Sequence, residues 1–492
     1  MLEKIRDRNL KKIHAAAERL NDTEAEVGSE SADEAQTSAR AVPDDPITAS
    51  LTCAADAAEA PSAEAPAPPT PPRLLVPAEA PADQLILTCI LTGVFTRIAK
   101  KKKKQSRSKP KKKEFEKVLE RMCAEPDNAN AQRDGFQALH QLVIKDPDNQ
   151  TAIALKGGIR VVVAAMTAHA RHADVQQQGC MVLMNLSSNN AHNKTAIAEA
   201  RGISAVVQAM KTHMAYAFVQ EQGSGVLASL SVSAVNHAAI ASAGGVRAVL
   251  AAMTAHLVHA GLQQQCCGAL ANLAVDDVNQ MEIVSAGGIH SVVVSMKAHA
   301  GHAGVQEQGC AVLTNLACDA ESETAIAGAG GIQVVLTAMT AHAGHAGVQE
   351  HGCGTLGNLA ESADNRIAIA RAGGIGLVVK AMQVHAGQAK VQEQGCSALS
   401  NLAANSDNKT AIADAGGIRV VVAAMQAHAG HVGIQEEGCG VLFNMGRSDT
   451  RLQKSIKDQG GVGVVEAAVV ALVSNAPCTM QARALLRKLA SL

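Results

Sequence analysis

The chain has 492 residues and a formal net charge of -1 at pH 7, so its overall charge gives no attraction to nucleic acid or an anionic membrane. Aromatic residues make up 1% of the sequence, with no Trp and one Tyr, which leaves almost no material for base-stacking platforms or aromatic cages. A chain of this length either divides into domains or grows by stacking repeated units.

The first 82 residues favour a short basic helix over Met1 to Leu20, followed by an Ala-, Pro- and Glu-rich arm that we expect to be disordered. This arm lacks the apolar periodicity that offsets the entropy of ordering a chain. No secretory signal is evident, and we expect the 12 cysteines to be free thiols in a reducing compartment.

Residues 83–113 combine an apolar run with a basic block. The run LILTCILTGVFTRI, from Leu85 to Ile98, is too short and too rich in Thr for a membrane span. Lys100 to Lys113 contains nine Lys and one Arg. Three interpretations of this block stay open: a nuclear import signal, an electrostatic membrane tether helped by the apolar run, or a solvated linker.

From Glu114 onward the sequence repeats. The dipeptide GG or a close variant recurs at steps of 43 or 44 residues, a period typical of helical solenoids. Its second glycine stands at Gly158, Gly202, Gly245, Gly288, Gly331, Gly374, Gly417 and Gly461.

Each unit predicts three helices. In one copy a short helix covers Asn365 to Ala372, a second covers Ile375 to about Ala386, and a third covers Val391 to Ala403. The polar cluster from Ser362 to Asn365 is expected to cap the first helix. Of the two glycines, the first is expected to take the left-handed conformation and the second to allow close approach of the chain.

The motif xGGIxxVVxAM followed by VQExGCxxLxNLA, present from Gly330 to Ala360 with Leu336 in place of one Val, resembles the armadillo repeat. The resemblance covers residues 114–492 and implies an all-α, right-handed superhelical solenoid of about eight to nine units with degenerate terminal caps. The His-Ala-Gly connectors are similar to those in the armadillo region of large leucine-rich-repeat kinases, although no kinase or GTPase motif occurs here.

In armadillo proteins an Asn ladder on the third helices holds the backbone of an extended peptide in a concave groove. Ser229 interrupts the matching column in this chain. A carboxamide suits this role because it both donates and accepts. The same side chains could instead brace neighbouring helices without any ligand. The column consists of Asn185, Asn272, Asn315, Asn358, Asn401 and Asn444.

Importin-α-like receptors place Trp one turn before each Asn. This chain has Met, Gly, Ala or Ser there, which disfavours an importin-like transport adaptor. An acidic row stands two turns before the Asn column, with Gln177 and Gln264 as exceptions. It either complements the dipoles of its own helices in their first turn or forms a groove rim that favours basic ligands. The row contains Glu221, Glu307, Glu350, Glu393 and Glu436.

Histidines recur in pairs three residues apart, a spacing that can share a metal, but no regular third ligand follows and we expect no metal or cofactor. A favourable position near helix C-termini explains them equally well. The pairs are His169/His172, His256/His259, His299/His302, His342/His345 and His428/His431. The Cys column is expected to be core. The aromatic pair Tyr216 and Phe218 is either a contact spot or local repacking.

The favoured function is therefore a non-enzymatic adaptor that holds extended or helical protein segments, including basic ones. The chain's own Lys100 to Lys113 is one candidate ligand. No phosphate loop, nucleophile elbow or carboxylate pair supports an enzyme. A membrane-surface scaffold recruited through residues 85–113 is the alternative, although membrane contact is disfavoured, and no specific nucleic-acid partner is expected. We expect a cytoplasmic location, or a nuclear one if the basic block is an import signal.

Overall fold

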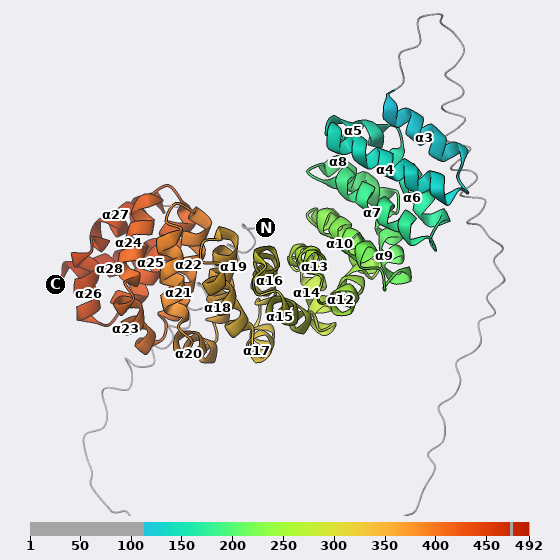
Figure 1. Cartoon of the computed structure of the whole chain (residues 1–492). Helices are drawn as coiled ribbons and strands as arrows, with labels where there is room; N and C mark the ends of the chain where they lie inside the picture. Colours follow the sequence, from blue (N-terminus) through green and yellow to red (C-terminus); the bar gives the residue numbers. More distant parts are fainter. Residues whose placement is uncertain (1–112, 473–475, 492) are drawn as a thin grey trace, which may run out of the picture. The chain divides into compact units, whose positions relative to one another are not determined.

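The computed structural model describes residues 113–472 and 476–491 (Figure 1). Within these ranges the chain forms 26 α-helices and one 3-10 helix, η1 (Ala234–Asn236), and no strand. The helices follow one another as a solenoid of stacked units, which confirms the predicted all-α repeat architecture. The N-terminal arm, the apolar run and nearly all of the basic block lie outside the described residues, so the predictions for them stay predictions.

A first unit of two helices is followed by eight units of three. The third helices are the longest and stack directly on one another, while the second helices pack on the third helices of their own unit. The first helices are α5 (Asp148–Leu155), α8 (Ala191–Glu199), α11 (His237–Ser242), α14 (Asp277–Ser285), α17 (Ala320–Gly328), α20 (Ala363–Arg371), α23 (Ser406–Asp414) and α26 (Thr450–Asp458).

The second helices are α3 (Glu114–Ala124), α6 (Gly158–Ala168), α9 (Gly202–Thr212), α12 (Gly245–Ala255), α15 (Gly288–Ala298), α18 (Gly331–Ala341), α21 (Gly374–Val384), α24 (Gly417–Ala427) and α27 (Gly461–Ala471). The third helices are α4 (Ala129–Lys145), α7 (Ala173–Ser187), α10 (Ala217–Ser231), α13 (Ala260–Leu273), α16 (Ala303–Leu316), α19 (Ala346–Leu359), α22 (Ala389–Leu402), α25 (Val432–Gly446) and α28 (Ala476–Ala490).

The GG dipeptide makes the turn between first and second helices as predicted. Gly373 has φ 82°, in the left-handed region where a side chain is disfavoured. A Cβ on Gly374 would collide with the Cγ2 atom and the carbonyl oxygen of Ile369, so the second glycine is needed for close packing. Arg201 replaces the first glycine in one unit and still adopts φ 62°.

The predicted first-helix cap is wrong in the one copy for which it was drawn. Ser362 occupies the N-cap position of α20 but makes no side-chain cap hydrogen bond. Asn405, at the same place in the next unit, accepts from the amides of Asp407 and Asn408. Capping of the first helix therefore differs from unit to unit.

One hydrophobic core runs through the stack. Cys396, Leu399 and Leu402 on α22 are fully buried, as predicted for the repeating column. A Cβ on Gly395 would collide with Cγ of Met382, so small residues of the third helix admit the Met of the second. This close contact fixes the distance between the two helices.

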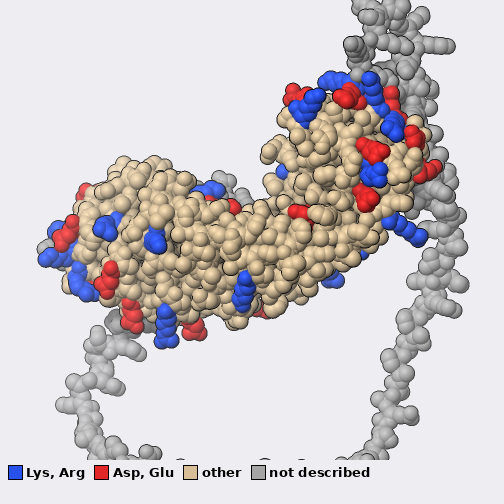
Figure 2. All heavy atoms as spheres, viewed as in Figure 1, with Lys and Arg blue, Asp and Glu red and all other residues tan. Residues whose placement is uncertain are grey.

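Charged side chains gather over the first and last helices in the view of Figure 2, while few lie over the middle of the array. Terminal units of a solenoid have one face without a neighbouring unit, and charged residues there meet water. In the described part of the chain no single helix is both long and apolar enough to cross a membrane, although four bent helix pairs meet those criteria by length and composition.

Candidate functional site

The predicted Asn column forms a row of hydrogen bonds between successive third helices. Nδ2 of Asn358 donates to the carbonyl oxygen of Thr314 at 2.9 Å, and Nδ2 of Asn401 donates to that of Gly357 at 2.9 Å. Asn272, Asn315 and Asn444 donate in the same way to the preceding third helix, at 3.1, 2.8 and 3.0 Å. These residues are partly exposed. The bracing role considered from the sequence is therefore present.

The first two positions of this pattern differ from the rest. Nδ2 of Asn185 lies 2.8 Å from Nδ1 of His140 and 2.8 Å from the carbonyl oxygen of Met181. Ser229, at the interruption, accepts a 2.8 Å hydrogen bond from the hydroxyl of Ser187. Among the described residues, hydrogen bonds of the six Asn side chains use Nδ2, and Oδ1 is left for other acceptor contacts.

The acidic row does not lie where its dipole interpretation places it. The third helices begin about two residues earlier than predicted, at Ala303 and Ala346, so Glu307 and Glu350 fall in the second turn. Glu393 and Glu436 lie equally far into α22 and α25. Each third helix takes in two residues before the predicted start, which are Ala-Gly in α16 and α19, Ala-Lys in α22 and Val-Gly in α25.

Glu307 instead faces the start of the next third helix. A Cβ on Gly347 would collide with its Oε1 atom, and Gly433 stands in the same relation to Glu393. At Lys390, which replaces this glycine in one unit, Nζ lies 3.5 Å from Oε1 of Glu350. A carboxylate beside a helix N-terminus is favourable, so the row complements the dipole of the neighbouring helix.

One further column of this face carries ionisable exceptions. The position seven residues before each Asn is Gln in most units, but His351 and Glu437 replace it in two. Burial lowers the pKa of His351, partly offset by Glu350 and Glu307. Burial, with Glu393 and Glu436 nearby, raises the pKa of Glu437 to about 8. Glu437 is therefore largely protonated at neutral pH.

The histidine pairs have structural partners that the sequence did not reveal. Nε2 of His342 lies 2.8 Å from the carbonyl oxygen of Ala300 in the preceding connector, and six other histidines make the equivalent contact. Because a carbonyl only accepts, Nε2 carries the proton. The second histidine of a pair, such as His345, accepts from a backbone amide at the start of the third helix. These contacts occupy one ring nitrogen on each.

Sequence reasoning also missed a buried glutamine in the first eight of the nine units, a position that Thr479 occupies in the last. Nε2 of Gln349 donates to the carbonyl oxygens of Met339 and His342, at 2.9 and 3.0 Å. It thereby satisfies the C-terminal carbonyl groups of the second helix from within the third. The sequence signal for this role is the Gln of the VQE motif, which stands at the same position in eight units. The others are Gln132, Gln176, Gln220, Gln263, Gln306, Gln392 and Gln435.

The Cys column lies in the core as predicted, and burial raises the pKa of Cys180, Cys267 and Cys353 to about 12. Such thiols stay protonated and are poor nucleophiles. No group of three or more His, Cys, Asp or Glu side chains is arranged to hold a metal ion in the described ranges. Tyr216 and Phe218 are more than half exposed, and the Phe218 ring contacts His259 edge-on at 6.0 Å.

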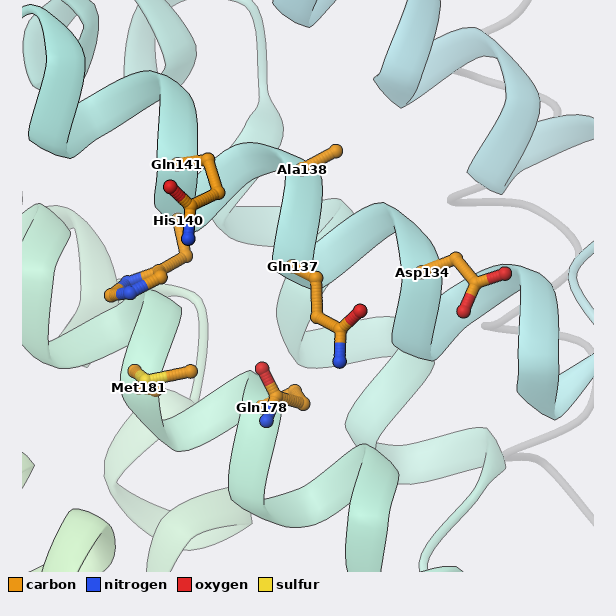
Figure 3. Close-up of a pocket in the computed structure, with 7 residues that line it drawn as sticks. All are labelled: Asp134, Gln137, Ala138, His140, Gln141, Gln178 and Met181. Carbon is orange, nitrogen blue, oxygen red and sulfur yellow. The ribbon is translucent and has the colours of Figure 1, made fainter.

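A pocket of about 530 Å³ lies between α4 and α7. Gln137 and Gln141 occupy positions one repeat before Met181 and Asn185, so the pocket is on the face that carries the Asn column. Figure 3 shows Gln137 and Gln178 extending toward each other, with Met181 below the His140 ring. The lining residues are Asp134, Gln137, Ala138, His140, Gln141, Gln178 and Met181.

No protein-family model and no curated protein matches the sequence. Among solved structures, the fold is similar to an engineered protein from the Northeast Structural Genomics Consortium, with a TM-score of 0.56 and 24% identity over 76% of this chain and 98% of that one. A second engineered protein from that consortium has a TM-score of 0.45 and 24% identity over 50% of this chain and 97% of its own. The first likeness supports the helical repeat fold alone.

Proposed function

We propose that the protein is a non-enzymatic scaffold of the armadillo type, whose Asn-bearing face binds segments of other proteins. The observation that carries the proposal is the alignment of partly exposed Asn and Glu side chains at one-repeat spacing along the third helices. Their regular spacing offers the same polar contact to each successive stretch of an extended ligand.

The structure changes how such a ligand would be held. The Nδ2 atoms are engaged with the neighbouring helices, as for Asn358 with Thr314, so Oδ1 is the atom that meets the ligand. An amide oxygen accepts from backbone N–H groups of any sequence. The carboxylates of Glu307 and Glu393 add negative charge to this face and favour ligands with basic residues. A nuclear or cytoplasmic adaptor role fits these properties.

Partner capture from cell extract with cross-linking tests the proposal. We expect the triple change Asn315→Ala, Asn358→Ala and Asn401→Ala to lose partners that the wild type retains. The triple change to Asp keeps the acceptor oxygen but removes the Nδ2 donor. Partners that bind through Oδ1 should therefore still be captured by the Asp variant.

The Asn bonds also stabilise the array, so the control must weaken it elsewhere. Changing His299, His342 and His385 to Ala removes three inter-unit hydrogen bonds from the connectors of the same region. Thermal unfolding should show destabilisation of both triple-Ala variants. Equal loss of partners from the Asn and His variants would contradict a binding role for the Asn face.

A further inference from the structure

We propose that the pocket between α4 and α7 is a subsite for a primary carboxamide, the side chain of Gln or Asn in a bound protein segment. This inference deepens the proposed scaffold function, because the pocket lies at the N-terminal end of the Asn-bearing face. The first two units would then prefer a ligand that places Gln or Asn at this pocket.

The charges around the pocket cancel locally. Nη2 of Arg133 donates to Oδ1 of Asp134 at 2.9 Å, so the one carboxylate of the lining already has a cationic partner. Burial lowers the pKa of His140, which favours its neutral form. A lysine or arginine head would have to compete with Arg133, and a carboxylate would be repelled by Asp134. A neutral polar ligand avoids both costs.

The pocket offers both hydrogen-bond donors and an acceptor that lacks a partner. Nδ2 of Asn185 only donates, so Nδ1 of His140 is the acceptor of their 2.8 Å contact and the His140 proton is on Nε2. The amide of Gln137 is a second donor. Oε1 of Gln178 has no hydrogen-bond partner in the structure and almost no exposed surface, so the partly exposed Gln178 side chain must turn to present it to a ligand. An unpaired buried acceptor is unfavourable, and a donor entering the pocket would relieve that cost.

A primary carboxamide matches this arrangement. Its NH₂ group donates to Oε1 of Gln178, and its oxygen accepts from Gln137 or from Nε2 of His140. Met181 lies beside these groups and packs against the methylene stem of a Gln ligand (Figure 3). The volume of about 530 Å³ accommodates a side chain of this size.

The test uses the full chain labelled with ¹³C at the methionine methyl groups, with the Met181 signal assigned through Met181→Leu. N-acetylglutamine methylamide is titrated to 50 mM, beside the capped glutamate and capped lysine analogues. We expect the glutamine probe to shift the Met181 signal saturably, with at least fivefold weaker responses to both charged probes.

Two Gln variants make the test specific. Gln178→Leu should weaken the glutamine response at least fivefold. Gln222→Leu should leave it unchanged, because Gln222 holds the same place one unit later, also has a buried unpartnered Oε1, and does not line the pocket. Unchanged signals from the other methionines show that each variant is folded.

No saturable shift, equal response to all probes, tighter binding of the lysine probe, or an unaffected Gln178→Leu variant would each overturn the carboxamide assignment. Capped amino acids span only one pocket. Partner capture by the Asn face can therefore fail while the pocket still binds its probe, and the reverse also holds.

Discussion

At the residue scale, the units are so similar that a residue that differs in one unit can be compared with the residues at the same position in the others. Arg201 stands where seven units have a left-handed glycine, and it keeps φ 62°. The turn is therefore imposed by the flanking helices, and the side chain bears the conformational cost.

Arg201→Gly should stabilise the protein, by up to about 1 kcal/mol, because relief of the left-handed penalty exceeds the entropy gained by the unfolded chain. Urea unfolding monitored by circular dichroism measures the change. Gly373→Ala is the matched control, since a Cβ there meets nothing within 4 Å and the residue has φ 82°. Gly373→Ala should lower the free energy of unfolding only because alanine disfavours the left-handed conformation. An unchanged free energy of unfolding would refute this account of the turn.

Glu437 gives the array a dependence on pH. Its folded pKa of about 8 lies above the ordinary value of 4.5, so the folded state binds the proton more tightly than the unfolded state. Stability from this group is present below about pH 4.5 and is lost as the pH rises toward 8. Glu393 and Glu436 strengthen the effect, and a hydrogen bond with Ser397 opposes it.

Glu437→Gln should remove that loss, giving a gain of about 1 to 2 kcal/mol at pH 9 relative to pH 5, since the partly exposed residue feels less than the full shift. Gln394 holds the same position one unit earlier, so Gln fits the site. Urea midpoints at the two pH values measure the difference. Parallel pH profiles for both proteins would show that Glu437 is not the group responsible.

At the element scale, the second and third helices of each unit are joined by polar as well as apolar contacts. The buried Gln349 reaches two carbonyl groups at the end of α18, which α18 cannot satisfy itself. Met339 of α18 also packs against Gly352 of α19. The pair therefore has one preferred register.

Gln349→Leu should cost about 1 to 3 kcal/mol, because the buried carbonyl oxygen of Met339 loses its side-chain donor, while that of His342 keeps the backbone amide of His345. Gln333→Leu, on the exposed side of α18, changes the same residue type and should stay within about 0.5 kcal/mol. Differential scanning calorimetry of both variants makes the comparison. Equal effects would mean that the buried Gln serves no capping role.

At the scale of the whole molecule, each unit contacts chiefly its neighbours through the Asn bonds, the His bonds and the shared core. Stability is then a sum of unit and interface contributions. Within the described residues, the charged first and last units have a neighbouring unit on one side only, which fits their departure from the repeat (Figure 2).

Deleting residues 331–373 joins Gly330 to Gly374 and should leave a shorter folded array. Asn401 would then take the place of Asn358 on the carbonyl oxygen of Thr314. We expect unchanged helicity per residue and a small fall in melting temperature, measured by circular dichroism. An aggregated or molten product would show that the units are not interchangeable.

The sequence alone determined the helical repeat, the glycine turn and the Cys–Leu core, because these depend on local conformation and apolar spacing within one unit. Tertiary structure decided the roles of polar side chains, since those depend on which atoms the neighbouring unit presents. Thus the Asn amide nitrogens meet backbone carbonyls, His342 reaches the preceding connector, and Glu307 faces the next helix. The pocket at Gln178 likewise exists only where two units meet.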